Sequence, residues 1–145
     1  MKTFRFRLQT VLEHRERVER EKRGALARAR ARVLDSERAL SEMQAAHAEA
    51  AEDARRTACG AVDVARARET REYLATLRRR MAGTRGRLRT LEMEFALRRE
   101  EAVKARGERK VLAAFKSRLH VRHVRRMRRL EQAELDDVAQ RLATR

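Results

Sequence analysis

Two long series of positions, spaced alternately three and four residues apart, constrain the fold of this chain more than any other feature. The first series runs from Leu8 to Ala54, and the second runs from Leu74 to Ala133. Apolar residues dominate both series, and charged residues fill most positions between them. Apolar positions that repeat about every 3.5 residues are typical of coiled coils, in which each helix buries one narrow face, the seam. The pattern predicts two long helices.

The composition agrees with a fold that buries only a narrow seam. The chain has 145 residues, no proline and only five glycines. Charged residues make up 41% of it and aromatic residues 3%, so the bulky side chains of a compact globular core are scarce. Such a profile is typical of long helices. The predicted fold class is all-α, with two long helices that form an antiparallel coiled-coil hairpin and an overhanging C-terminal helix.

The position of the turn follows from a break in the spacing. The two series are one residue out of step, so the seam is interrupted between Thr57 and Leu74. Gly60 is the one glycine in that window, and glycine readily ends a helix. We therefore expect residues 1–145 to form a single coiled-coil hairpin, with helix one at about 4–58, the turn at about 58–64 and helix two at about 64–142. The opening alternation Phe-Arg-Phe-Arg-Leu also fits a strand, but its continuation into the repeat favours a helix from residue 4.

This hairpin leaves part of helix two without a partner. Facing residues have numbers that add to about 122, so the region beyond Leu119 extends past helix one. Unburied apolar residues at helical spacing require a partner, and we expect this overhang to be a docking element. Its apolar residues are Val121, Val124, Met127, Leu130, Leu135, Val138 and Leu142. Within the hairpin, the seam is poorest in apolar contacts where Arg15, Glu19 and Lys22 face Ala102 and Ala105.

The charge is strongly unbalanced, with 38 basic and 22 acidic residues and a net charge of +16. From Arg109 to Leu130 there are nine basic residues and no acidic residue, and six arginines between Arg78 and Arg89 form a second acid-free cluster. Such clusters favour acidic proteins, nucleic acid or anionic membranes. The chain has no helix-turn-helix spacing or zinc framework, and its C-terminal segment is acidic, so no specific nucleic acid is expected as a partner. A basic coiled-coil nucleic-acid-binding protein remains an alternative.

Catalysis finds little support in the sequence. There is no Gly-x-x-x-x-Gly-Lys phosphate loop, and His120 and His123 have no further ligands at metal-binding spacing. We expect no enzymatic activity, no catalytic or metal-binding residues and no cofactor. Cys59 is the only cysteine, and no apolar run approaches the roughly 20 residues that span a bilayer. These features predict a cytoplasmic protein.

Both ends of the chain resemble one known family. The start, F-R-F-R-L-Q-T-V-L, is similar to the Phe-x-Phe-x-Leu-x-x-Val-Leu signature of FliJ proteins. Near the end, the family's closing Glu-Gln-x-x-Leu-Asp-x-x-Ala segment is matched by Glu131, Gln132, Leu135, Asp136 and Ala139. The chain thus resembles the FliJ family.

The resemblance implies a non-enzymatic component of bacterial flagellar protein export, and therefore of motility, that is similar to the central stalk of rotary ATP synthases. Its implied partners are the export ATPase FliI and the export gate protein FlhA, and it could escort export chaperones. It would lie in the cytoplasm, peripheral to the inner membrane at the flagellar base. The stalk protein of a virulence type III secretion system is a further alternative, because it would share the hairpin.

Two groups of residues take roles from this resemblance. The predicted ATPase-binding residues match the ends of the family, and they are Phe4, Phe6, Leu8, Val11, Leu12, Leu119, Arg122, Arg126, Leu130, Gln132, Leu135 and Asp136. The predicted export-gate-binding residues are Tyr73, Leu77 and Met81. Tyr73 is the sole tyrosine and lies beside the seam, where its ring can present an edge outward.

Overall fold

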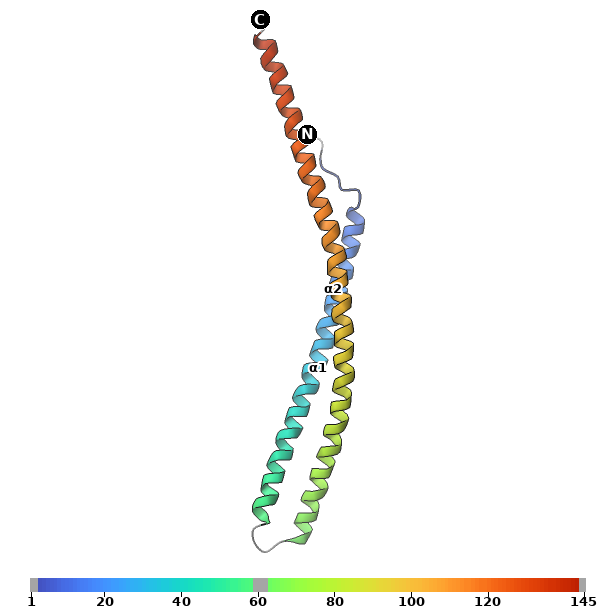
Figure 1. Ribbon diagram of the computed structural model, residues 1–145, viewed down its shortest axis with the longest axis vertical. Coiled ribbons are helices and arrows are strands. Elements are labelled where there is room, and N and C mark those ends of the chain that lie inside the picture. Colours follow the sequence, from blue (N-terminus) through green and yellow to red (C-terminus); the bar gives the residue numbers. More distant parts are fainter. Residues whose placement is uncertain (1–2, 59–62, 144–145) are drawn as a thin grey trace. The chain divides into compact units, whose positions relative to one another are not determined.

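The computed structural model describes residues 3–58 and 63–143, and within these ranges the chain is helical without strands (Figure 1). Helix α1 spans Gln9–Thr57 and helix α2 spans Val64–Ala143. The two helices pack against each other, which confirms the predicted all-α class of two long helices. Cys59 and Gly60, on which the predicted turn is centred, lie outside the described residues.

The chain divides into two compact units, each of which contains a piece of both helices. The terminal unit consists of Met1–Lys22 and Ala102–Arg145, and the central unit consists of Arg23–Glu101. In the central unit Arg32 contacts Glu94 and His47 contacts Arg78, and in the terminal unit Gln9 contacts Lys116 and Arg15 contacts Glu108. Within each unit, residues further along α1 therefore meet residues earlier in α2, so the two pieces are antiparallel. The prediction that the whole chain is a single domain stays a prediction.

The seam of the central unit follows the predicted spacing. Ala29, Leu77 and Met81 are buried, with exposed fractions of 1%, 6% and 7%. The remaining predicted seam positions in this unit are partly buried, and they are Leu26, Val33, Ser36, Leu40, Met43, His47, Ala50, Ala54, Leu74, Thr84, Leu88, Leu91, Phe95 and Arg98. The pattern of burial follows from the 3–4 repeat, because residues at that spacing share one face of a helix.

Two polar contacts flank the apolar seam of the central unit. Arg32 Nη2 donates to Glu94 Oε1 at 2.8 Å, and Arg78 Nε donates to His47 Nε2 at 3.2 Å. Both contacts are solvent-exposed. Exposed pairs of this kind contribute little to stability. The buried apolar residues therefore hold this unit together, and the polar pairs mark the alignment of its helices.

Helix α1 begins at Gln9, and not near residue 4 as the sequence predicts. Residues 4–6 have no regular secondary structure, and the Gln9 amide donates to the Phe6 carbonyl at 3.2 Å where the helix starts. The physical reason lies in the Phe-x-Phe alternation. In an extended segment, Phe4 and Phe6 point to the same side, so both rings can reach α2. The expectation of a helix from residue 4 is therefore wrong for these residues.

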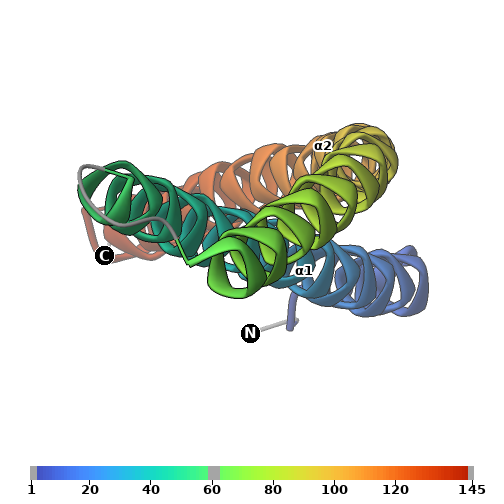
Figure 2. The same ribbon diagram turned by 90° about the horizontal axis from the view of Figure 1, so that it is seen from below.

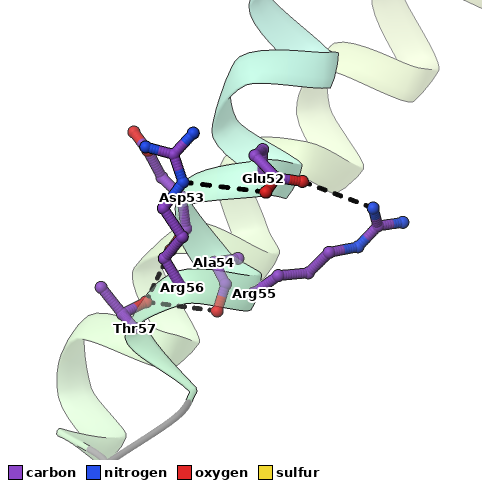
Figure 3. Close-up of polar contacts among 6 residues, drawn as sticks. All are labelled: Glu52, Asp53, Ala54, Arg55, Arg56 and Thr57. Carbon is purple, nitrogen blue, oxygen red and sulfur yellow. Dashed lines mark hydrogen bonds and ion pairs between the residues drawn. The ribbon is translucent and has the colours of Figure 1, made fainter.

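The end of α1 and the start of α2 are nearest the viewer in the ribbon view of Figure 2, and side chains of these residues bond to the backbone at both helix ends. The Thr57 hydroxyl donates toward the carbonyls of Asp53 and Ala54, at 2.9 and 3.2 Å, and Arg55 and Arg56 pair with Glu52 in the last turns (Figure 3). Basic residues at this end interact favourably with the helix dipole.

At the start of α2, the Asp63 carboxylate accepts hydrogen bonds from the amides of Ala65 and Arg66, at 3.0 and 3.3 Å. Asp63 is thus an N-cap residue that satisfies two amides of the first helical turn. An aspartate immediately before a helical segment is a recognised start signal, and here it fixes the first residue of α2 as Val64.

The seam of the central unit predicts that two leucine-to-alanine substitutions lower the free energy of unfolding by very different amounts. Leu77→Ala should lower the free energy of unfolding by about 2–3 kcal/mol, because it leaves a cavity beside Met81. Leu34→Ala is the matched control, since Leu34 is 40% exposed in the same unit and should cost under about 1 kcal/mol. Urea unfolding followed by circular dichroism measures both. Equal losses for the two variants would contradict the placement of the seam.

Candidate functional site

An aromatic cluster ties the start of the chain to α2 in the terminal unit. The Phe4 ring packs edge-on against His120, with centroids 5.1 Å apart, and tilted against His123 at 5.6 Å. The Phe6 ring packs edge-on against Phe115 at 6.1 Å, and Phe6 is 8% exposed. Such edge-to-face contacts add stability beyond the burial of the rings. The cluster therefore fixes how far along α2 the N-terminal segment reaches.

In the terminal unit, the part of the seam that follows this cluster along α1 is polar. Lys116 Nζ donates to Gln9 Oε1 at 2.8 Å, and Arg15 Nη1 donates to Glu108 Oε2 at 2.5 Å. These contacts lie where the sequence predicts few apolar residues, so ionic and hydrogen-bonded pairs fill that part of the seam. Leu12 and Ala105 supply buried apolar surface in the same unit, with exposed fractions of 4% and 6%.

The pair between Glu19 and Arg109 is the most enclosed of the ion pairs in this unit. Arg109 Nε donates to Glu19 Oε2 at 2.7 Å, and the two side chains are 29% and 19% exposed. This hydrogen bond, together with the charge of Glu19, raises the pKa of the Arg109 guanidinium. Because arginine is already protonated at any physiological pH, the pair keeps its charge. The main effect of this ion pair is to align α1 with α2, because a shift of one helix along the other would separate the carboxylate from the guanidinium.

An open pocket lies beside the aromatic cluster and has a basic lining. It is formed by Phe4, Arg5, Phe6, Arg7, Gln9, Thr10 and Lys116. Three of these seven residues are cationic, and none is acidic. A partner that enters this pocket would therefore meet an apolar wall and positive charge, which suits an acidic protein surface.

Beyond the cluster, α2 carries large apolar side chains on its surface. Val121 is 44% exposed, Leu130 49%, Leu135 65% and Val138 54%. The basic residues around them, among them Arg122 and Arg126, are exposed as well. Within the last turns, Gln132 donates to Asp136 at 2.9 Å and Arg141 pairs with Asp137 at 2.7 Å. These are contacts within one helix, and they leave the apolar side chains uncovered.

The predicted ATPase-binding residues divide by burial. Phe6 and Leu12 are buried in the seam, and Phe4 and Leu119 are half-buried. Leu8 and Val11 are 39% and 43% exposed. Those further along α2 are all exposed, and they are Arg122, Arg126, Leu130, Gln132, Leu135 and Asp136. All of these residues belong to the terminal unit. Their binding role stays a prediction.

The predicted gate-binding residues lie in the central unit. Tyr73 is 50% exposed, whereas Leu77 and Met81 are buried in the seam. Tyr73 also lines a shallow pocket with Ala50, Asp53, Ala54, Thr57, Arg66, Glu69 and Thr70. Sequence reasoning missed this pocket, because it depends on how closely the end of α1 approaches the start of α2. A partner at this surface would meet the Tyr73 ring first, and the role of the three residues stays a prediction.

Two further searches of the described residues gave negative results. No described helix is both long and apolar enough to cross a membrane. Within residues 3–58 and 63–143 there is also no group of three or more histidine, cysteine or acidic side chains with the geometry to hold a metal ion.

The fold and the exposed helix faces define an all-helical protein with two paired helices. A family model described as the flagellar FliJ protein matches residues 4–145, nearly the whole chain, and the chain belongs to this family. This match confirms the resemblance at the two chain ends. The family is a non-catalytic component of flagellar export, so the chain has a function related to that export. Searches of the curated proteins and of the solved structures found no match to it.

The ion pair between Glu19 and Arg109 predicts that reversing one charge lowers the melting temperature and that exchanging both charges restores it. Glu19→Lys should lower the melting temperature, because it places a lysine against Arg109 in a partly buried position. The double variant Glu19→Lys with Arg109→Glu should recover most of the loss, since the opposite charges face each other again. Thermal unfolding of the four proteins measures this coupling. Purely additive losses would mean that the two residues do not pair.

Proposed function

We propose that this chain couples the flagellar export ATPase to the export gate as a non-enzymatic binding protein. In this proposal the terminal unit engages the ATPase, and the Tyr73 surface of the central unit engages the gate. The protein acts in the cytoplasm, peripheral to the membrane at the flagellar base, and can escort export chaperones. Membership of the FliJ family supports the general role, and the two surfaces supply the specific contacts.

The observation that carries the ATPase contact is the part of α2 beyond the aromatic cluster. Phe4 meets α2 at His120 and His123, and α2 continues to Ala143. In that continuation Leu135 and Val138 are more than half exposed. This segment is the overhang of the proposal. Apolar side chains that lie on a helix surface at helical spacing gain free energy when a partner covers them.

The overhang offers different chemistry on its two sides. Val124, Met127, Leu135 and Val138 fall on one face by their spacing, and exposed Arg118, Arg122, Arg125 and Arg129 fall on the opposite face at steps of four, three and four. A flat partner would cover only one of these faces. A socket that surrounds the helix can use both, with apolar contacts on one side and acidic groups on the other. The arrangement therefore suits a ring-shaped ATPase.

The gate contact is proposed at the Tyr73 surface because an exposed aromatic ring beside a pocket is a favourable anchor for a protein partner. The ring is half exposed, and the pocket beside it contains Asp53 and Glu69 as well as Arg66. This surface belongs to the central unit, whereas the overhang belongs to the terminal unit. The two contacts therefore use separate residues, and one chain can make both.

A reciprocal binding experiment tests both contacts at once. Leu130→Asp with Leu135→Asp should weaken binding of the full-length chain to its export ATPase by roughly 100-fold, because two apolar anchors are lost. Tyr73→Ala should weaken binding to the cytoplasmic part of the export gate by roughly tenfold. Each variant should keep the partner that the other loses. Affinity is measured with purified partners, after DNA has been removed by nuclease.

Leu34→Asp serves as the control, because it places a carboxylate on a partly exposed site of α1 that belongs to neither surface. Circular dichroism should show that all variants remain helical. Unchanged ATPase affinity in the Leu130 and Leu135 variant would refute the overhang contact. Binding of both partners that disappears once nucleic acid is digested would favour the basic nucleic-acid-binding alternative.

A further inference from the structure

We propose that two copies of this chain associate antiparallel through the outer face of α2 in the central unit, with Thr90 at the twofold axis. The outer face is the set of exposed positions opposite the seam, namely Gly83, Gly86, Thr90, Met93 and Leu97. The proposed function does not use these residues, so the two proposals stand on separate surfaces. The spacing, exposure and charges of this face support the pairing.

The outer face has its own coiled-coil spacing. From Gly83 the positions advance by three, four, three and four residues to Leu97. This repeat lies about half a helical turn away from the seam residues Thr84, Leu88 and Leu91. A helix with a second 3–4 repeat opposite the first can pair on both sides, and α1 occupies only one of them.

Two large side chains on this face are poorly covered by the chain itself. Met93 is 66% exposed and Leu97 is 54% exposed, and they lie one helical turn apart. Single exposed apolar residues are common on protein surfaces. Two of them in line with a 3–4 repeat form a short apolar ridge, which a second helix could cover.

The two glycines provide places for such side chains. At Gly83 and at Gly86, an added Cβ would meet nothing within 4 Å, so no contact within the described chain requires a glycine there. Glycine inside a helix is nonetheless less favourable than alanine by about 1 kcal/mol. Missing side chains leave shallow depressions on the helix surface. A partner side chain can enter these depressions and bring the two backbones close together.

In an antiparallel dimer, the apolar ridge of each copy lies against the glycine depressions of the other copy. If Thr90 faces Thr90 of the other copy, Gly86 faces Met93 of that copy and Gly83 faces its Leu97. The same alignment is repeated in the opposite direction by the twofold symmetry, as expected of an isologous interface. Each large side chain is thus placed against a glycine of the other copy, and neither helix needs to change its conformation.

Charges at the two ends of the outer face favour the same antiparallel alignment. Arg79, Arg80, Arg85, Arg87 and Arg89 are exposed, and none of them makes an ion pair or hydrogen bond within the described part of the chain. The acidic residues Glu92 and Glu100 are likewise exposed and unpaired there. Antiparallel pairing about Thr90 brings Arg79, which is in line with the outer face, to Glu100 of the other copy, and the twofold axis repeats this pair. Parallel pairing would instead place Arg79 against Arg79 and Glu100 against Glu100.

The expected interface is small. About 20 residues of helix, roughly 30 Å long, contribute from each copy, and such a contact buries on the order of 1,000 Å² in total. This area is near the lower limit for specific association, so the dimer should dissociate in roughly the micromolar range. We therefore expect a reversible dimer whose population depends on protein concentration.

Sedimentation equilibrium of the full-length chain over a range of concentrations tests the association. Wild-type protein should show a monomer–dimer equilibrium. Met93→Asp should raise the dissociation constant by roughly 100-fold or more, since the substitution acts twice in a symmetric dimer. Leu34→Asp is the matched control, because Leu34 is 40% exposed on α1 and belongs neither to the outer face nor to the two proposed partner surfaces, and it should leave the equilibrium unchanged. A wild-type chain that stays monomeric throughout, or a dimer insensitive to Met93→Asp, would overturn the proposal.

Charge reversal and cross-linking test the alignment. Arg79→Glu should weaken the dimer, and adding Glu100→Arg should restore it. In a Cys59→Ser background, Thr90→Cys should form a disulfide between copies, and a mixture of Gly83→Cys and Leu97→Cys chains should do the same. Gly83→Cys alone should not cross-link, because its two copies lie far apart in the antiparallel dimer. Cross-linking of Gly83→Cys to itself would indicate a parallel dimer and refute the assignment.

Discussion

Burial of one narrow face on each helix is the constraint on which the rest of this structure depends. With few aromatic residues and many charges, the chain has no other apolar surface from which to build a core. The free energy of pairing must therefore come from positions repeated every three or four residues, of which Leu77 and Met81 are the best covered. A narrow seam also leaves most of each helix surface free. We propose that the binding functions of the chain lie on that surface.

The apolar seam and the polar seam contribute different properties. In the central unit, buried leucine, methionine and alanine side chains supply stability with little dependence on ionic conditions. In the terminal unit, Glu19 pairs with Arg109 and Arg15 with Glu108, so the alignment of the helices is specified by charge. Paired charges that are partly buried stabilise less than apolar residues of the same size, but they penalise a wrong register. The aromatic cluster around Phe4 then anchors the chain start beside the overhang.

Much of the fold could be predicted from the sequence, because a 3–4 repeat directly reports which residues share a helix face. Every predicted seam position between Leu12 and Ala54 is buried or partly buried. The start of α1 could not be predicted as well, since contacts of Phe4 and Phe6 with distant residues of α2 decide it. The ion pairs of the polar seam could not be predicted either. The sequence shows which of these positions are charged, but it does not show which residue of α1 pairs with which residue of α2.

The candidate sites were predictable to different degrees. The exposed apolar residues of the proposed overhang could be recognised because their helical spacing continues beyond Leu119, where the sequence predicts that pairing with helix one stops. For the Tyr73 surface, the aromatic residue could be recognised from the sequence, but the pocket beside it could not, because that pocket is formed by the ends of both helices. The outer face was present in the sequence as a second 3–4 repeat. Its two glycines, however, indicate a turn as readily as a contact surface until the helix is seen to run through them without interruption.

We propose that pairing of α2 with the rest of the chain ends near His123 and that the part of α2 beyond it binds the export ATPase. Hydrogen exchange read residue by residue, with and without the ATPase, tests this most directly. In the free chain, amides of residues 77–95 should exchange slowly and those of residues 124–143 rapidly, because helices without tertiary packing open readily. Addition of the ATPase should slow exchange in residues 124–143. Slow exchange of that segment in the free chain, or no change on adding the ATPase, would contradict the account.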